Sequence, residues 1–361
     1  MTAGSNLWLM TTEPAFDIGV LCRSHPCGQR QLLEDFGEEQ LRRSAWRSNI
    51  QVSPRPISLY VHVPCSYGSC FDCGGNGNLG REPGRSEHYV ARLLQELRLI
   101  APLFDTRREV FQLHLGGGTA HFLGPTQLSR LLVGLAGGFR LSRATERDFS
   151  MALDPRRVDE RDIALLARLG FNRVSLGVLD FDLRVQQALN RVHSVGETLA
   201  VIEACRRNGL RSVSVDLIYG LPLQTPDGFA RTLDIVIAAQ PERVAVRAHR
   251  QVAQAALPGP EARLTLRQQA VDRLGAAGYR HIGMGLFALS EDDLARAQET
   301  GGLHRNFIGY TTQADCDLVG LGAGAISHIG SSLSQNHPEI SGWEAALAQN
   351  QLPVARGLEL G

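Results

Sequence analysis

Short apolar runs and amphipathic stretches alternate along most of this chain of 361 residues. The first run, ISLYVHVP at residues 57–64, is rich in β-branched residues and ends at a proline, which is typical of a buried strand. Residues 86–100 then carry apolar side chains at three- and four-residue spacing, which predicts an amphipathic helix. The same reasoning predicts strands at 111–115, 149–153, 173–179, 212–218, 243–248 and 281–287, and helices at 126–136, 159–169, 196–208, 228–239 and 261–277.

The spacing of these elements predicts an α/β fold. Successive strands lie about 30 residues apart, which favours parallel strands joined by right-handed crossovers. Six or seven such units favour a barrel or partial barrel over a small open sheet. We therefore expect a partial (β/α) barrel core over residues 56–290. Residues 1–55 show weak periodicity and are expected to form an N-terminal extension, and residues 291–361 a C-terminal segment that packs on the core.

Composition narrows the classes of partner. Lys and Arg together number 37, as do Asp and Glu, so nothing in the charge balance points to nucleic acid or to an acidic membrane surface. No apolar run approaches the roughly 20 residues needed to span a bilayer, and the N-terminus lacks the features of a secretory signal. We expect a cytoplasmic protein that does not bind nucleic acid and does not span a membrane. Seven cysteines, an odd number, argue against a disulfide framework and favour metal ligation.

Three of these cysteines follow the first predicted strand, in PCSYGSCFDC at residues 64–73. Their spacing, Cys65-x4-Cys70-x2-Cys73, equals that of the close-set trio of plant-type iron–sulfur ligands. Three thiolates on a short loop can hold three irons of a [4Fe–4S] cluster and leave the fourth iron open. A structural zinc would need a fourth Cys or His, and none is adjacent. Another metal and a plain loop are the alternatives.

The other four cysteines carry weaker signals. Cys205 and Cys316 stand alone in apolar segments and are expected to be small buried hydrophobes. Cys22 and Cys27, with His25 between them, form a weaker candidate for a second metal pair.

Glycines, aspartates and an arginine gather near the expected carboxyl ends of the strands, where a barrel places its chemistry. LGGGTA at residues 115–120 allows a ligand to approach the backbone closely, although a simple turn would need the same glycines. Asp154, Asp180 and Asp216 follow or end predicted strands, and Arg191 lies in the stretch after Asp180. Each alone reads equally as a cap or an ion-pair residue. Because all four are expected at the same end of the barrel, they together favour a functional site there.

Five stretches together resemble the oxygen-independent coproporphyrinogen III oxidases, which are radical S-adenosylmethionine (SAM) enzymes. They are HVPCSYGSCFDCGGN, LHLGGGTAHFL, FNRVSLGVLDF, DLIYGLPLQTP and LHRNFIGYTTQADCDLVGLGAGAIS. Within the last, RNFIGYTTQADCDLVG separates these oxidases from other radical SAM enzymes. The resemblance runs from about residue 30 to the C-terminus. It implies a partial (β/α) barrel of the radical SAM type, here expected without the family's usual C-terminal domain.

The resemblance also implies cofactors and a reaction. Cys65, Cys70 and Cys73 would hold a [4Fe–4S] cluster, with SAM on the open iron. Cleavage of SAM would give a 5′-deoxyadenosyl radical that removes hydrogen from two propionates of coproporphyrinogen III. Loss of carbon dioxide would then leave the vinyl groups of protoporphyrinogen IX, in haem biosynthesis. An electron donor such as a flavodoxin or ferredoxin is implied, and a monomer is expected. The positions that match the SAM sites of the family are Tyr60, Gly117, Gly118, Thr119, Arg191, Asp216 and Ile326.

The sequence departs from the family pattern at the site itself. The family's first cysteine aligns with Ser66, one residue after Cys65. Each polar contact to SAM that is lost costs about 1–3 kcal/mol of binding free energy. The segment after His249 is about ten residues shorter than usual. Two alternatives therefore stay open: an impaired paralogue that binds porphyrin, haem or a partner enzyme, and a radical SAM enzyme with another substrate. The other departures are Gly75 for a cysteine, Ala152 for an acidic residue, Leu179 for a glutamine, and Gly285 and Leu286 for an Asp–His pair.

Overall fold

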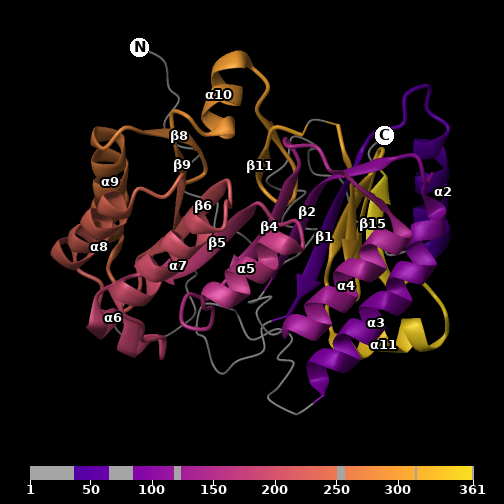
Figure 1. Ribbon diagram of the computed structural model, residues 1–361, viewed down its shortest axis with the longest axis horizontal. Coiled ribbons are helices and arrows are strands. Elements are labelled where there is room, and N and C mark those ends of the chain that lie inside the picture. The colour runs from indigo at the N-terminus through magenta and orange to yellow at the C-terminus, as the bar shows by residue number, and fades with distance from the viewer. Residues whose placement is uncertain (1–35, 65–83, 118–122, 250–256, 314, 360–361) are drawn as a thin grey trace.

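A 13-stranded mixed sheet runs through the molecule, flanked by helices (Figure 1). The computed structural model describes residues 36–64, 84–117, 123–249, 257–313 and 315–359. The strand order is β15-β14-β13-β12-β1-β2-β4-β5-β6-β7-β9-β8, and β3 pairs with β2. The strands are β1 Ile57–Val63, β2 Glu109–Gly117, β3 Arg140–Leu141, β4 Asp148–Leu153, β5 Arg173–Leu179, β6 Ser212–Tyr219, β7 Arg243–Ala248, β8 Tyr279–Gly283, β9 Leu286–Leu289, β12 Asp317–Leu321, β13 Ile326–Ile329, β14 Ser332–Asn336 and β15 Val354–Glu359. A separate small hairpin pairs β10 His304–Arg305 with β11 Tyr310–Thr311.

The predicted alternation of parallel strands and helices is confirmed. Strands β1, β2, β4, β5, β6 and β7 are parallel to one another, β12 joins the free edge of β1 in the same direction, and β9 pairs antiparallel with β7 at the other edge. Side chains cap several helices where the sequence predicts a start, for example Ser194, which accepts a hydrogen bond from the backbone of Glu197. The helices are α2 Glu38–Asn49, α3 Arg85–Ile100, the 3₁₀ turn η2 Ala101–Leu103, α4 Pro125–Gly138, α5 Glu160–Arg168, α6 Leu183–Ala188, α7 Val195–Arg207, α8 Pro226–Ala239, α9 Pro260–Ala276, α10 Asp293–Thr300 and α11 Ile340–Ala348.

The parallel strands have one apolar face and one largely polar face. Alternate residues of β1, namely Leu59, Val61 and Val63, belong to the main hydrophobic core, as do their counterparts on β2, β4, β5, β6 and β7. The residues between them must point to the other side of the sheet, because side chains alternate along a strand. On β1 and β2 that inner side carries Tyr60 and His114 among mostly polar residues. The sheet therefore encloses an interior lined mostly by polar side chains, which a hydrophobic core alone would not need.

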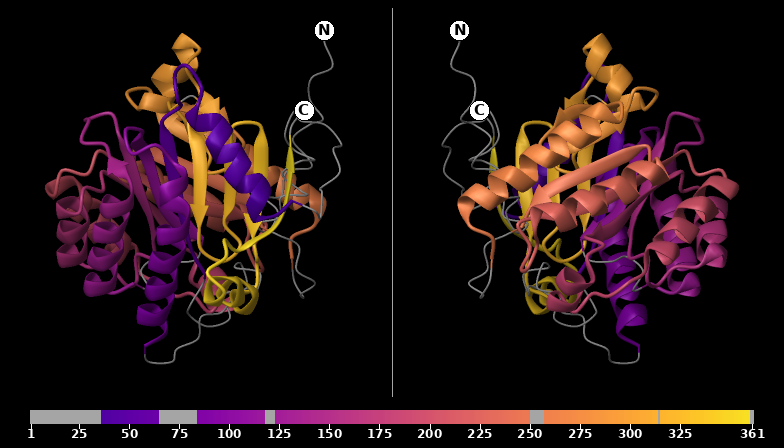
Figure 2. Two further views of the ribbon diagram at one scale, coloured as in Figure 1. Left: turned by 90° about the vertical axis from the view of Figure 1, so that its right-hand side faces the viewer. Right: turned by 90° about the vertical axis from the view of Figure 1, so that its left-hand side faces the viewer.

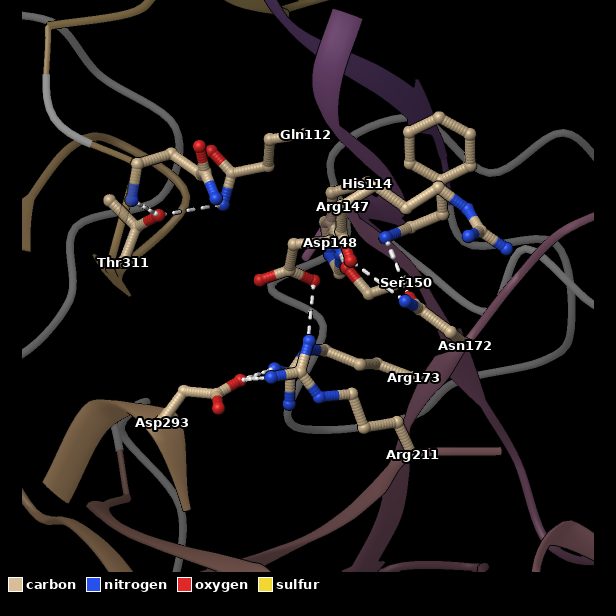
Figure 3. A network of polar contacts seen from close by, with 12 residues as sticks. Gln112, His114, Arg147, Asp148, Ser150, Asn172, Arg173, Arg211, Asp293 and Thr311 are labelled. Carbon is tan, nitrogen blue, oxygen red and sulfur yellow. Dashed lines mark hydrogen bonds and ion pairs between the residues drawn. The ribbon is translucent and has the colours of Figure 1, made fainter. Parts of the chain in front are cut away.

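Charged side chains close this interior at the amino ends of the strands (Figure 3). Arg173, at the start of β5, lies 3.4 Å from Asp148 and 2.5 Å from Asp293, which begins α10. Arg211 also pairs with Asp293. Arg243 on β7 pairs with the neighbouring Asp292 at 2.9 Å. These contacts fix α10 across the end of the sheet opposite to the predicted site.

One predicted strand is wrong in detail. The stretch HIGMGLF at residues 281–287 is not one strand, because the chain reverses within it and forms the antiparallel hairpin of β8 and β9. Met284 and Gly285 occupy the turn with φ of 48° and 77°. A Cβ at Gly285 would lie 2.2 Å from the carbonyl oxygen of Val246, so only glycine fits there. The two glycines of this stretch are the sequence signal for the turn.

The C-terminal strands and α2 lie together at one edge of the molecule (Figure 2). Strands β13, β14 and β15 continue the sheet in antiparallel fashion beyond β12, and α2 packs on β13 and β14. The boundaries at residues 55/56 and 290/291 stay predictions. No helix within the described ranges combines the length and the apolar character needed to cross a membrane.

Candidate active site at the carboxyl ends of the strands

Three stacked rings lie on the inner side of β1 and β2. The ring of Tyr60 stacks on His62 at 6.0 Å between centroids and on His114 at 5.8 Å. The edge of Phe307, from the segment between β10 and β11, meets Tyr60 at 5.9 Å. Burial lowers the pKa of both His62 and His114 to about 4, so both imidazoles are neutral at neutral pH. The rings form an uncharged wall beside the end of β1.

The glycine run lies next to this wall. Gly117 ends β2 with φ of 107°, and a Cβ there would lie 1.8 Å from His62 Cδ2. A Cβ at Gly116 would lie 2.4 Å from His114 Nε2. The two glycines therefore let the backbone of β2 pass close to the rings, and any larger residue would displace them. Gly118 and Thr119 lie outside the described residues.

Arg191 and Asp154 meet at the ends of β4 and β5. Arg191 donates from Nη2 to the carbonyl oxygen of Gly177 at 2.7 Å, and lies 3.5 Å from Asp154 Oδ2. Arg156 binds the same carboxylate through two nitrogens. Burial opposes the charge of Asp154, but the hydrogen bonds and positive charge of the two arginines outweigh it and hold its pKa below the ordinary value. Arg191 Nε is buried and has no hydrogen-bond partner among the described residues.

Asp180 binds two segments that follow β6. It accepts hydrogen bonds from Gln224 Nε2 at 2.6 Å and Thr232 Oγ1 at 2.7 Å, so it holds the loop after β6 and α8 to the end of β5. Burial raises its pKa, although these hydrogen bonds counteract the effect. These contacts serve local structure, although they are neither the cap nor the ion pair that was the alternative to a site role.

Asp216 and Ile326 are the remaining positions matched to SAM among the described residues. Asp216 lies within β6, where it pairs with Gly177 of β5 and Ala245 of β7, and it is half-buried. Its position corrects the prediction that it follows or ends a strand. Ile326 is fully buried at the start of β13, after the turn that follows β12.

Sequence reasoning missed His193 and Arg247. His193 has a backbone hydrogen bond to Gln186, and its buried Nε2 has no hydrogen-bond partner within the part of the chain that the structure describes. Burial lowers its pKa. Arg247 is exposed near the end of β7, on the strand face opposite to the core residues Val244 and Val246. The only available signals were the position of His193 two residues after Arg191 and the strand alternation around Arg247.

The cysteine prediction lies outside the described residues, because Cys65, Cys70 and Cys73 all fall in the range 65–83. Among the residues that are described, no group of three His, Cys, Asp or Glu side chains is arranged to hold a metal ion. Cys205 is fully buried and burial raises its pKa to about 12, whereas Cys316 is only partly buried. Cys22, His25 and Cys27 also lie outside the described residues.

Besides Gly285 and Leu286 in the β8–β9 hairpin, two departures from the family pattern lie in the described residues. Leu179 has φ of 70° and belongs to a small hydrophobic cluster with Val185, Leu189, Ile218 and Leu221. Ala152 lies on β4 opposite Ser175, on the inner side of the sheet. Leu179 is thus used for packing, whereas Ala152 leaves an inner position without a carboxylate.

The fold and the arrangement of this site define a radical SAM protein. Residues 64–236 match the family described as the radical SAM superfamily. The predicted fold of this type is confirmed.

Three known proteins narrow the class further. The oxygen-independent coproporphyrinogen III oxidase of Pseudomonas aeruginosa is 47% identical over 313 residues, which cover 84% of this chain and 68% of that protein. The protein of the same name from Escherichia coli is 39% identical over 337 residues, covering 91% and 72%. A solved structure, described as the coproporphyrinogen III oxidase of Escherichia coli and a radical SAM enzyme, matches with a TM-score of 0.86 and 37% identity over 95% of this chain and 80% of that one. The chain belongs to the oxygen-independent coproporphyrinogen III oxidase family.

A [4Fe–4S] cluster and SAM are the cofactors of this class, and the described residues fit SAM at Arg191. Arg191 offers the unused buried Nε–H described above, which suits a carboxylate or ribose oxygen. Gly116, Gly117 and Gly177 let the rings of His114 and His62 and the guanidinium of Arg191 lie against the strand backbone. The three-thiolate donor set of residues 65–73 matches the chemistry of iron–sulfur ligation.

Proposed function

We propose that this protein is an oxygen-independent coproporphyrinogen III oxidase, which converts two propionate side chains of coproporphyrinogen III to vinyl groups and yields protoporphyrinogen IX. The observation that carries the proposal is the match to the Escherichia coli coproporphyrinogen III oxidase over 95% of this chain at a TM-score of 0.86. Family membership at 47% identity supports the same activity. No finding favours the non-catalytic alternative.

In this proposal the residues that match the family's sites bind and orient the cofactors. Cys65, Cys70 and Cys73 are the cluster ligands, and the cluster and SAM supply the radical chemistry when bound. Arg191 and Asp216 hold polar groups of SAM, and the backbone at Gly117, Gly118 and Thr119 approaches it closely. Tyr60 and Ile326 provide apolar contact.

Arg247 is our candidate for the substrate propionates. A guanidinium pairs with a carboxylate through two hydrogen bonds, and an anionic substrate needs such a partner in the interior. The position of Arg247 supports this role: it lies on the face of β7 opposite to the core residues Val244 and Val246, and its positive charge contributes, after burial, to the lowered pKa of His114.

The remaining partners follow from the activity. An electron donor such as a flavodoxin or ferredoxin would reduce the cluster. We further propose that the protein is a cytoplasmic monomer.

The test is anaerobic reconstitution followed by iron counting and a SAM-cleavage assay. About four irons per chain and reductant-dependent formation of 5′-deoxyadenosine are expected. The Cys70→Ala variant is the control and should lose both. Wild-type protein that takes up no iron, yet binds a porphyrin or haem, would contradict the proposal in favour of a binding protein.

A further inference from the structure

Glu96 is a buried carboxylate on α3 that is surrounded by N–H donors. Its side chain accepts hydrogen bonds from Asn336 Nδ2 at 2.6 Å, from the Gly322 backbone at 2.8 Å and from Trp343 Nε1 at 2.9 Å. The residue is only 1% exposed, and no Lys, Arg or His in the described ranges is among the groups that act on its carboxyl. Burial raises its pKa to about 7, although the three hydrogen bonds counteract the effect. Burying a carboxylate without a cation costs free energy. The three N–H donors offset this cost only while they stay within hydrogen-bond distance of the carboxylate.

Tyr89 extends this contact to β1. It lies two helical turns before Glu96 on the same face of α3. Its hydroxyl donates to the carbonyl oxygen of His62 at 2.8 Å and accepts from the backbone N–H of Ala323 at 3.2 Å. Its ring packs on Trp343 of α11 at 4.9 Å. One hydroxyl thus joins the end of β1 to the turn that follows β12.

The turn at Gly322–Gly324 is held from both sides. Its Gly322 donates to Glu96 through N–H and accepts from Asn336 Nδ2 through its carbonyl at 2.9 Å. Gly322 has φ of 103°, and a Cβ there would lie 2.4 Å from the carbonyl oxygen of His62. The turn and the end of β1 are therefore in direct contact, and neither can shift without the other.

These contacts lie between two sides of the proposed cofactor site. On one side, the end of β1 carries Tyr60 and His62 and leads to the cysteine loop. On the other, the turn leads directly into Ile326. We propose that Glu96 and Tyr89 are positioning residues, which clamp the Gly322–Gly324 turn to the end of β1 and so set the width of the SAM site. This inference rests on the proposed function.

The first experiment needs no cofactor. Hydrogen–deuterium exchange is followed in peptides covering residues 318–326 of the wild type and the Glu96→Gln variant. An amide side chain must direct its own NH₂ toward one of the three donors. At a pH above about 8, where the wild-type carboxyl is ionised, the turn of the variant should therefore open and exchange about tenfold faster, as expected for loss of a hydrogen bond to a charged group. Glu87→Gln is the matched control, because it makes the same change on the exposed face of α3. Tyr89→Phe is the second variant, since it removes only the bridging hydroxyl and keeps the ring on Trp343.

The second experiment measures the SAM Kd of the reconstituted proteins at equal iron content. Glu96→Gln and Tyr89→Phe should each weaken SAM binding about tenfold, whereas Glu87→Gln should not. Faster exchange without weaker binding would overturn the positioning role, and weaker binding without faster exchange would overturn the clamp. No change in either measurement would also overturn the inference. If the wild type itself binds no SAM, the proposed function fails, and the exchange data still decide whether the clamp exists.

Discussion

Asp317→Asn tests how firmly the C-terminal strands are joined to the core. Asp317 begins β12 and is fully buried, with its side chain 1% exposed and 2.5 Å from Arg108 Nη2, which is 2% exposed. Ser48 of α2 donates to the same carboxylate, and the backbone of Gly330 donates to its second oxygen at 2.9 Å. Arg108 also donates to the carbonyl oxygen of Arg55 at 2.7 Å. The pair therefore connects α2, β2, β12 and the turn after β13.

The expected cost follows from what the amide leaves behind. Asparagine keeps the shape and one acceptor, but the Arg108 guanidinium stays buried without an opposite charge. Removing one partner of a buried pair costs about 3–5 kcal/mol, and we expect the lower end because the remaining hydrogen bonds persist. For a chain of this size, that corresponds to a fall in Tm of about 5 °C.

The assay is thermal unfolding of the variant beside a matched control, Asp105→Asn. Asp105 also lies 2.5 Å from an arginine, but that arginine, Arg107, is 85% exposed, so solvent screens the pair. The control should unfold within a degree or so of the wild type. If the two variants lowered Tm equally, burial would not be the source of the stability, and the reasoning would be refuted.

Four further predictions concern the site. Gly117→Ala should abolish measurable SAM binding, because its Cβ would displace the ring beside it on β1; equal SAM affinity would contradict this. Cys70→Ala and Cys65→Ala should each lose the cluster by iron analysis, and a full complement of iron in Cys65→Ala would show that the shifted thiol is not a ligand. Burial keeps the pKa of His114 near 4, below 6.5 in the unfolded chain, so protonation of the unfolded state lowers stability as pH falls from 6.5 to 4. His114→Gln should flatten this acid loss in urea titrations. Arg247→Gln should raise KM for the porphyrinogen about tenfold or more with SAM affinity unchanged.

Apolar runs and helical periodicity in the sequence were sufficient to predict the parallel strands β1, β2, β4, β5, β6 and β7, but β12, β13, β14 and β15 were not predicted as strands of the sheet. The run 57–64 corresponds to β1 because that strand is buried on both faces, and the pattern at 86–100 corresponds to α3 because one face of that helix is buried. The hairpin of β8 and β9 was not predicted because HIGMGLF is largely apolar, and only the backbone conformation at Met284 and Gly285 separates its two halves. Helix α2 was not predicted because its buried face consists mostly of small residues such as Ala45 and Ser48.

The site was harder to predict because its residues are far apart in the sequence and come together only in the folded structure. Position along the chain suggested that Asp154, Asp180 and Asp216 act together. In the structure, however, Asp180 accepts hydrogen bonds from Gln224 and Thr232 in a local network. The contact between Glu96 and Gly322 joins residues 226 positions apart, and no local pattern marks it. Leu179 shows that a departure from a family motif can reflect packing, since it fills an apolar cluster.

Product analysis tests the central claim most directly. The reconstituted protein would be incubated without oxygen with coproporphyrinogen III, SAM and a reductant, and the oxidised porphyrins separated by chromatography and weighed by mass spectrometry. We expect protoporphyrin, with both propionates replaced by vinyl groups, and none in the Cys70→Ala variant. Intact coproporphyrin as the sole product, from wild-type protein with a full complement of iron that also cleaves SAM, would contradict the account.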